Sequence, residues 1–280
     1  MSTTIYWFSG TGNSLHAARS IADRLHDETR VVAMAQVLRS GNRPQAEGRI
    51  GIVCPVYALG LPAIVQRFIR RLPKDGAESV FAVVTFAATS GGAIPLLQRK
   101  LAKRGLPLHQ AFGLKMPENY PPMGGPPPDE KQRRLLEQAE SKIEKVAATL
   151  NQAEEPCREK ANILLRTLGR IASPWFSRGL KKADAKFRAN DRCNCCGVCA
   201  RLCPVDNIEI KLEKPAWLGH CEQCFACLHW CPQTAIEYGR RSQRQPRYHH
   251  PQTELEDFLQ IRGKKAEVAT DAAENRQFQW

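Results

Sequence analysis

The sequence predicts an open, doubly wound α/β domain followed by a small domain built around cysteines. Strand-like runs alternate with helical patterns through about the first 150 residues, an order typical of a parallel sheet covered on both faces. Nine of the 11 cysteines lie between Cys193 and Cys231. Their spacing repeats once, at an offset of 28 residues. Clustering of this kind is typical of metal ligands rather than of disulfides.

Five strand-like runs, rich in β-branched and aromatic residues, set the order of the first domain. They cover residues 3–8, 29–34, 49–56, 80–87 and 109–116. Helical patterns, with apolar residues three or four apart, cover residues 14–25, 62–72, 92–105 and 129–150. Because doubly wound sheets bind ligands where the strand order reverses, we expect a site in the loops after the first and third strands.

The loop after the first strand has the composition of an anion-binding turn. Its residues are Ser9, Gly10, Thr11, Gly12, Asn13 and Ser14. The two glycines allow a tight turn and a close backbone approach to a ligand, and the following helix start offers free N–H groups to a phosphate. The Walker and Rossmann patterns are both absent, so the alternative is an ordinary strand-to-helix turn.

This loop resembles the FMN phosphate loop of flavodoxins, and the layout of the first 150 residues is similar. The resemblance implies a flavodoxin-like, doubly wound parallel sheet with two further loops that hold the flavin ring. In this sequence those loops run from Pro55 to Gly60 and through Thr89, Ser90, Gly91 and Gly92. Tyr57 is the candidate for stacking on the ring, with a half-buried core tyrosine as the alternative. The second loop lacks an aromatic residue, and Phe86 is the nearest candidate.

The cysteine-rich region contains the pattern C-x2-C-x2-C-x3-C-P twice. The two runs are Cys193, Cys196, Cys199 and Cys203, and then Cys221, Cys224, Cys227 and Cys231. Three thiolates at this spacing bind three corners of an iron–sulfur cube, and in the bacterial two-cluster ferredoxins that show this pattern the fourth cysteine binds the other cluster. The pattern therefore assigns two [4Fe-4S] clusters, one to Cys193, Cys196, Cys199 and Cys231, the other to Cys221, Cys224, Cys227 and Cys203.

The repeat also separates Cys195 from the ligands. Gln223 stands at the corresponding place in the second run, so we expect Cys195 not to bind metal. Structural zinc is the main alternative to clusters, but zinc prefers two separated pairs of ligands around one tetrahedron. The cysteine region thus predicts a small α+β domain of the two-cluster ferredoxin type.

Composition and charge limit the compartment and the kinds of partner that we expect. The chain has 280 residues, 42% hydrophobic and 25% charged, as in ordinary globular proteins. Neither a membrane-spanning run nor the charged lead of a secretory signal is evident, so we expect a cytoplasmic protein. The net charge of +13 lies outside the cysteine region, because residues 191–240 carry −1. We expect an acidic redox partner and, without a recognition motif, no nucleic acid.

Four segments follow from these patterns. They are a flavodoxin-like domain at 1–150, a basic helical connector at 151–190, the two-cluster domain at 191–240 and a C-terminal extension at 241–280. Within the connector, residues 157–182 form a basic amphipathic stretch, so peripheral membrane contact is the alternative to packing between domains. Residues 117–128 form a proline-rich loop. In the extension, TELE at 253–256 has capping-box spacing and predicts a short helix to about Arg262, ended by Gly263 and followed by a frayed tail.

The whole arrangement resembles the flavodoxin–ferredoxin fusion proteins of anaerobic bacteria and archaea. The stretches Met116-Pro117-x-Asn119-Tyr120 and Arg247-Tyr248-x-His250-Pro251 also resemble that family. The resemblance implies an electron-transfer protein that relays electrons between two [4Fe-4S] clusters, an FMN and a partner enzyme. No acid–base constellation is evident, and we name no catalytic residue. The alternatives are a flavin-dependent reductase, whose own small substrate would bind between the Tyr57 loop and residues 117–128, and, less favoured, an iron–sulfur redox sensor.

Overall fold

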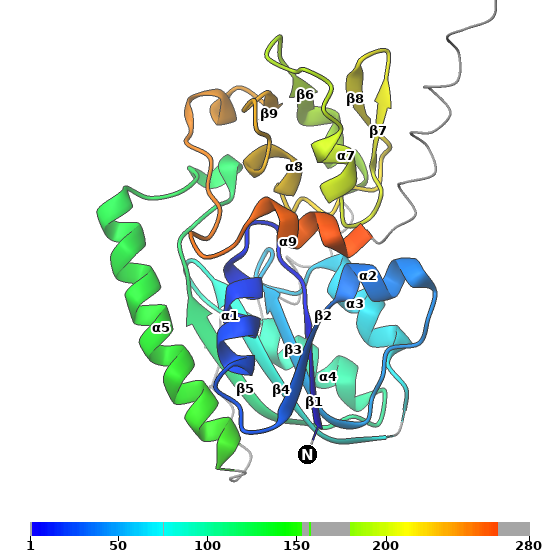
Figure 1. Cartoon of the computed structure of the whole chain (residues 1–280), viewed down its shortest axis with the longest axis vertical. Coiled ribbons are helices and arrows are strands. Elements are labelled where there is room, and N and C mark those ends of the chain that lie inside the picture. Colours follow the sequence, from blue (N-terminus) through cyan, green and yellow to red (C-terminus); the bar gives the residue numbers. More distant parts are fainter. Residues whose placement is uncertain (1, 75, 153–156, 158–179, 263–280) are drawn as a thin grey trace, which may run out of the picture.

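The computed structural model describes residues 2–74, 76–152, 157 and 180–262. Figure 1 shows a sheet domain below and a cysteine-rich domain above it, at the carboxyl ends of the parallel strands. The predicted connector and the proposed membrane-contact stretch lie mostly outside the described residues, as do Gly263 and the tail. Within the described residues, no helix is long and apolar enough to cross a membrane.

The lower domain contains one five-stranded parallel sheet. Its strands are β1 (Ser2–Trp7), β2 (Glu28–Ala33), β3 (Gly48–Pro55), β4 (Ala77–Phe86) and β5 (Leu108–Lys115). They stand in the order β2-β1-β3-β4-β5, with every neighbouring pair parallel. This is the flavodoxin-like strand order, in which the order reverses between β1 and β3. The predicted fold class is confirmed.

Helices cover both faces of this sheet and bury its apolar residues. They are α1 (Asn13–Ala22), α2 (Met34–Ser40), α3 (Ala63–Arg71), α4 (Ala93–Ala102) and α5 (Asp129–Asn151). On one face, α1 and α5 pack against Ile5 and Val53. On the other, α3 and α4 pack against Ile52. Helix α2 was not predicted, because a helix of seven residues that buries only Met34 and Ala35 shows no clear apolar period.

The upper domain is built from two antiparallel strand pairs, two short α-helices and two 3-10 helices, which are labelled η. Its elements are η2 (Leu180–Lys186), β6 (Phe187–Ala189), α7 (Val198–Leu202), β7 (Ile208–Lys211), β8 (Lys214–Trp217), α8 (Ala226–His229), β9 (Ile236–Tyr238) and η3 (Arg241–Arg244). Strand β6 pairs with β9, and β7 with β8. Strand β6 belongs to this domain but lies within residues 151–190, the segment predicted as connector. The domain therefore begins earlier than residue 191.

Two further short segments lie where the domains meet. Between β5 and α5, η1 (Pro121–Met123) interrupts the predicted proline-rich loop. After η3 the chain runs back toward the sheet domain and ends, within the described residues, in α9 (Leu255–Leu259) and η4 (Gln260–Arg262). A capping box does start α9, but at Glu254 with Asp257, one residue later than predicted. Thr253 is used differently, since its hydroxyl donates to the carbonyl of His250.

Candidate functional site

A cavity of about 410 Å³ lies at the carboxyl ends of the strands. Its lining comes from the loops that follow β1, β3, β4 and β5, and from residues 223–225 of the cysteine domain. The cavity lies where the strand order reverses between β1 and β3, the position expected for the ligand of a doubly wound sheet. Its volume is in the range of pockets that hold cofactors or other small molecules.

The loop of residues 9–14 forms one end of this cavity. Five of its six residues line the cavity, namely Ser9, Gly10, Thr11, Asn13 and Ser14. The Ser9 hydroxyl accepts a hydrogen bond from the Gly12 N–H at 3.0 Å, which closes the turn. Helix α1 starts without a side-chain cap, so its first backbone N–H groups keep their capacity to bind an anion.

Packing of the upper part of the chain accounts for both glycines of this loop. Gly12 has a φ of 99°, in the left-handed region. A Cβ on Gly12 would lie 2.1 Å from the Thr253 hydroxyl, and one on Gly10 would lie 2.1 Å from the carbonyl oxygen of Cys224. Gly12 therefore does not line the cavity, and the close approach that the sequence assigned to a ligand is made by the chain itself.

The loop after β3 doubles back at Ala58 and Leu59. Tyr57 and Gly60 exchange two backbone hydrogen bonds, at 3.0 and 2.8 Å. Ala58 and Leu59 have φ values of 46° and 59°, which cost non-glycine residues on the order of 1 kcal/mol each. Such strain is found at ligand clamps, and this turn forms a side of the cavity.

Pro55, Tyr57 and Phe86 all line the cavity. The ring of Tyr57 is half-buried and packs edge-on against Phe8, with 6.4 Å between centroids. Burial raises the pKa of Tyr57 well above its ordinary value, and the nearby thiol of Cys224 adds to the effect. The phenol therefore stays neutral and offers an aromatic surface to a planar ligand.

Of the predicted loop after β4, only Thr89 lines the cavity. Gly91, at a φ of 52°, packs against Leu59, whose Cα a Cβ would approach to 2.9 Å. Gly92 donates its N–H to the carbonyl of Leu59 at 2.8 Å, and Ser90 accepts from the first residue of α4. Ser90, Gly91 and Gly92 thus support the turn after β3, and the structure does not bring them to the cavity.

Sequence reasoning missed one wall of the cavity. Glu118, Asn119 and Tyr120 come from the loop after β5, and Gln223 faces them from the cysteine domain. The Tyr120 hydroxyl donates to Gln223 Oε1 at 3.0 Å, and Gln223 donates in turn to the Tyr238 hydroxyl at 3.0 Å. The sequence signals for this wall were the resemblance of residues 116–120 to the fusion family and, for the reductase alternative, a pocket expected between the Tyr57 loop and residues 117–128. Gln223 had no such signal.

Two hollows in the cysteine domain each collect one predicted quartet of thiols. The first is lined by Cys193, Cys196, Cys199 and Cys231. The second is lined by Cys203, Cys221, Cys224 and Cys227. Each hollow thus takes three cysteines from one run and the fourth from the other, which is the crossover that the spacing predicts. Cys195 also lines the first hollow, where its thiol contacts the carbonyl of Glu213.

The two runs repeat in conformation as well as in sequence. Left-handed φ values occur at Cys195 and at its counterpart Gln223, and again at Gly197 and Phe225. Asn207 donates its N–H to the Cys203 thiol at 3.1 Å, and 28 residues later Ala235 donates to the Cys231 thiol at 3.3 Å. Backbone N–H groups aimed at sulfur are a means by which proteins stabilise iron–sulfur clusters.

Two buried donors lie next to the hollows without an acceptor among the described residues. They are the indole N–H of Trp217, which lines the second hollow, and the Nε–H of Arg247, whose guanidinium donates to the carbonyl of Ile236 in the lining of the first hollow. Buried donors of this kind are expected to have acceptors, and the sulfur atoms of a cluster are acceptors. The residues present therefore fit the predicted groups.

The geometry of the thiols differs from that of a single-ion site. Within the described residues, no three His, Cys, Asp or Glu side chains converge closely enough to hold one metal ion. A [4Fe-4S] cluster takes one thiolate at each of four separate irons, so it requires thiols spaced around a hollow.

Cys224 lies in the wall between the second hollow and the large cavity. It lines both spaces, as does its neighbour Phe225. The backbone of Cys224 also lies against Gly10 of the loop after β1. One member of the second cysteine quartet therefore also lines the cavity.

Buried polar contacts hold the two domains in this position. Glu222, 3% exposed, accepts from the Ile64 N–H at 2.9 Å and forms an ion pair with Arg67 at 2.7 Å. The Trp230 indole donates to the carbonyl of Gly10 at 3.0 Å. These contacts join α3 and the loop after β1 directly to the cysteine loops.

The segment after η3 completes the interface. The Tyr248 hydroxyl donates to Asn13 Oδ1 at 2.7 Å, and the His250 N–H donates to the carbonyl of Thr11 at 2.8 Å. The His250 ring stacks on His16 at 4.0 Å. The loop at the end of the cavity is thus covered by a segment that begins more than 230 residues later.

Comparison with solved structures finds several flavodoxins. A flavodoxin of Megasphaera elsdenii is 17% identical, over 50% of this chain and 98% of that one, with a TM-score of 0.33. One from the domain Archaea is 15% identical, over 53% and 99%, with a TM-score of 0.31. Flavodoxin 1 of Bacillus cereus is 20% identical, over 52% and 98%, with a TM-score of 0.31. No family model and no curated protein matches the chain.

Proposed function

We propose that this protein transfers electrons between two [4Fe-4S] clusters and an FMN, and exchanges them with a partner protein. The observation that carries the proposal is the position of Cys224, which lines both the second cysteine hollow and the cavity. A cluster ligand in the wall of a flavin site gives electrons a short path between the two groups. Such a pairing converts one-electron into two-electron chemistry, because clusters carry single electrons and flavins carry one or two.

The residues around the cavity suit the parts of FMN. The uncapped start of α1 and the loop of residues 9–14 suit the phosphate. Tyr57, Phe86 and Tyr120 supply aromatic surface for the ring, which stacks on flat apolar groups. The eight cysteines that repeat the same spacing in the two runs would hold the clusters, four in each hollow.

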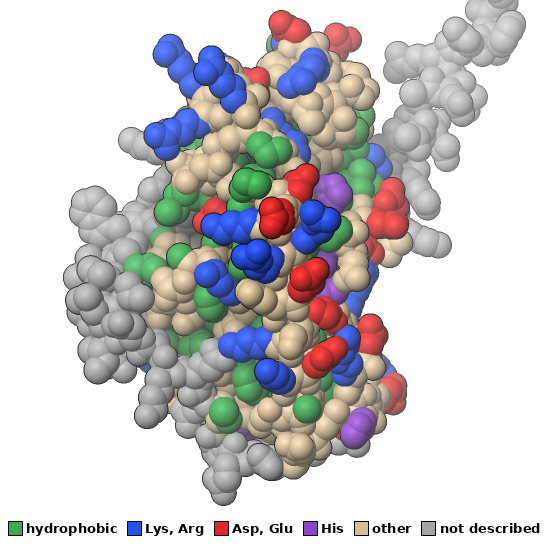
Figure 2. All heavy atoms as spheres, turned by 90° about the vertical axis from the view of Figure 1, so that its left-hand side faces the viewer, with side chains coloured by type: hydrophobic (Ala, Val, Ile, Leu, Met, Phe, Trp, Pro, Cys, Tyr) green, Lys and Arg blue, Asp and Glu red, His purple; other side chains and the backbone are tan. Residues whose placement is uncertain are grey.

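We propose an acidic partner, because the cysteine domain exposes arginines. Arg188, Arg192, Arg240, Arg241 and Arg244 are all exposed. Figure 2 shows the side of the molecule that lies on the left in Figure 1. On its upper part lie several Lys and Arg side chains, with a few acidic ones among them. Complementary charge raises the rate at which redox partners meet and makes that rate sensitive to salt.

The test is anaerobic purification followed by measurement of iron, sulfide and FMN on one sample. We expect about eight irons, as two [4Fe-4S] clusters require, and one FMN per chain. Eight irons without FMN, even after incubation with it, would contradict the flavin part of the proposal. Two zinc ions in place of iron would contradict the cluster part.

A second experiment separates the carrier from a reductase. A carrier oxidises its reduced flavin only when the partner is added, whereas a reductase turns over a small substrate alone. The proposed carrier role predicts no turnover of a small substrate in the absence of a partner.

A further inference from the structure

Two charged groups of the cysteine domain, one half-buried and one buried, form no ion pair among the described residues. One is Arg247, after η3, and the other is Asp184, in η2. They lie near different thiol quartets and carry opposite charges. Their positions bear on the clusters of the proposed function, and the inference drawn from them depends on that function.

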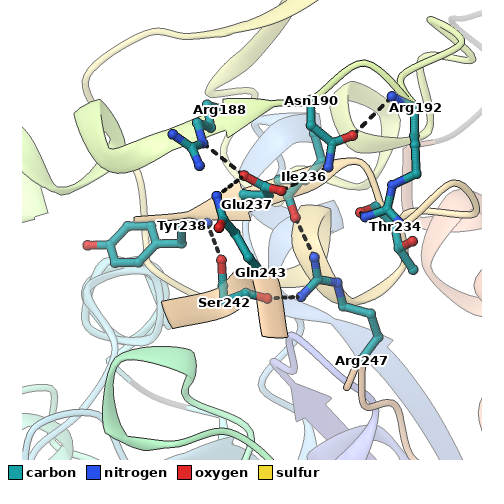
Figure 3. Close-up of polar contacts among 10 residues, drawn as sticks. All are labelled: Arg188, Asn190, Arg192, Thr234, Ile236, Glu237, Tyr238, Ser242, Gln243 and Arg247. Carbon is teal, nitrogen blue, oxygen red and sulfur yellow. Dashed lines mark hydrogen bonds and ion pairs between the residues drawn. The ribbon is translucent and has the colours of Figure 1, made fainter. Parts of the chain in front are cut away.

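Arg247 is a half-buried cation behind the first hollow. As Figure 3 shows, its guanidinium donates to the carbonyls of Ile236 and Ser242, at 2.7 and 2.9 Å. Ile236 itself lines the first hollow. Cys231 lines the same hollow, and Ala235, the neighbour of Ile236, donates its N–H to the Cys231 thiol at 3.3 Å. The guanidinium of Arg247 therefore lies one backbone carbonyl away from the lining of the first hollow.

The positive charge of Arg247 is not cancelled by a partner. Among the described residues, no carboxylate lies within ion-pair distance of its guanidinium. The nearby carboxylate of Glu237 is engaged by Arg188 at 2.8 Å, by Asn190 at 2.9 Å and by Gln243 at 3.0 Å (Figure 3). The first hollow therefore has a net positive neighbour.

Asp184 is a buried anion near the second hollow. It is 5% exposed, and its carboxylate accepts from the Gly219 N–H at 2.7 Å and from the Asn207 amide at 3.1 Å. Both donors are neutral, and no basic side chain among the described residues pairs with it. Asn207 lines the second hollow, so the Asp184 carboxylate lies one side chain away from it. The other charged groups at this quartet form ion pairs, Glu222 with Arg67 and Asp206 with Arg39, whose guanidinium also contacts the carbonyl of Cys203.

Adding an electron to a cluster adds one negative charge, so a nearby cation favours reduction and a nearby anion opposes it. We propose that Arg247 and Asp184 set the potentials of the two clusters apart. The cluster of Cys193, Cys196, Cys199 and Cys231 is then the easier to reduce. The cluster of Cys221, Cys224, Cys227 and Cys203, next to the cavity, is the harder to reduce and the stronger electron donor.

The test is an anaerobic redox titration followed by electron paramagnetic resonance, on the full chain with both clusters present. The unaltered protein should show two midpoints. Arg247→Gln should lower only the higher midpoint and Asp184→Asn should raise only the lower one. We expect each change to alter the reduction equilibrium of its cluster about tenfold, which is about 59 mV for one electron.

Controls separate charge from structure. Arg247→Lys keeps the charge but not the paired hydrogen bonds, and should leave the higher midpoint near its original value. Arg134→Gln, at an exposed arginine on α5, should move neither midpoint. If Arg247→Gln fails to fold, the isosteric Asp184→Asn change carries the test by itself.

The outcomes distinguish a failure of the inference from a failure of the proposed function. A single shared midpoint, or variants that move the opposite midpoint or neither, would overturn the inference while the iron and FMN contents still stand. Absence of both cluster signals, with iron below four per chain, would instead contradict the proposed function itself.

Discussion

The two cysteine runs of the upper domain share a backbone and differ in their surroundings. Gly197 and Phe225 are equivalent positions with left-handed φ values of 70° and 57°. A Cβ on Gly197 would meet nothing within 4 Å, whereas Phe225 is 2% exposed and lines the cavity. Likewise Asn194 is exposed while its counterpart Glu222 is buried against α3. One run faces outward and the other has become part of the interface with the sheet domain.

Under the proposed function, this difference predicts a division of roles. The first quartet includes the exposed Cys196 and suits exchange with a partner, whereas its counterpart Cys224 lies against the cavity. Equivalent substitutions in the two runs should therefore have unequal effects, and these pairs of variants sharpen or break the comparison.

The largest effect is expected for the paired ligands Cys196 and Cys224. Cys196→Ser and Cys224→Ser should each lose one cluster, because serine is a poor ligand for iron, and the iron content should fall by about half. Only Cys224→Ser should also weaken FMN binding, since only Cys224 lines the cavity. Iron, sulfide and FMN measured on the same sample check this. Equal loss of FMN in both variants would break the comparison.

Phe225→Ala should cost about 3 kcal/mol of unfolding free energy, because a buried aromatic side chain is removed. Gly197→Ala should cost about 1 kcal/mol, the strain of a left-handed alanine in open space. Anaerobic urea unfolding of the cluster-containing proteins measures both. If Gly197→Ala lowered the unfolding free energy more than Phe225→Ala, Gly197 would have a buried contact that the structure lacks.

Glu222→Ala should destabilise the protein by about 2 kcal/mol, since the Ile64 N–H loses its acceptor and Arg67 its partner. The Arg67 side chain is 42% exposed, so water offsets part of the loss. Asn194→Ala, at the equivalent exposed position, should change stability by less than about 0.5 kcal/mol. Limited proteolysis between the domains gives an independent readout. Similar losses of unfolding free energy in the two variants would argue against the conclusion that Glu222 holds the second run against α3.

The smallest effect concerns the segment that covers the loop at residues 9–14. Burial lowers the pKa of His250 to about 3, and the adjacent His16 and His249 add to the effect. The folded state therefore opposes protonation, so His250 contributes no destabilisation above its unfolded pKa of about 6.5. As the pH falls below that value, the unfolded state gains protons first and stability is lost.

Between pH 7 and 5.5 this should remove about 1 kcal/mol from the unfolding free energy. His250→Gln should show a correspondingly smaller pH dependence, and urea unfolding at the two pH values measures it. His26→Gln, at an exposed histidine, is the control and should retain the original dependence. An unchanged pH dependence in His250→Gln would show that His250 is protonated equally in both states.

Much of the fold and of the grouping of the cysteines could be predicted because the signals are local. Strand and helix periods, the loop at residues 9–14 and the cysteine spacing each fit within a few residues of sequence. The proline after Cys203 and after Cys231 indicated the crossover of the fourth cysteine. The two hollows contain the quartets that this rule assigns.

The interface could not be predicted, because its contacts join residues far apart in the chain. Gly10 meets Trp230, and Asn13 meets Tyr248. A glycine in a loop has the same sequence signature whether a ligand or another loop lies against it, so the sequence alone did not show that Gly12 and Gly91 pack against other parts of the chain. His250 also reads as a surface residue until the packing that buries it is known.

Electron exchange in the single-cluster variants tests the central claim most directly. In Cys196→Ser, which keeps the quartet next to the cavity, photochemically reduced FMN should pass an electron to the remaining cluster as fast as in the unaltered protein. In Cys224→Ser, supplied with enough FMN to fill the cavity, this transfer should slow by at least about tenfold, because only the farther quartet is left. Fast transfer in Cys224→Ser together with slow transfer in Cys196→Ser would contradict the path through Cys224.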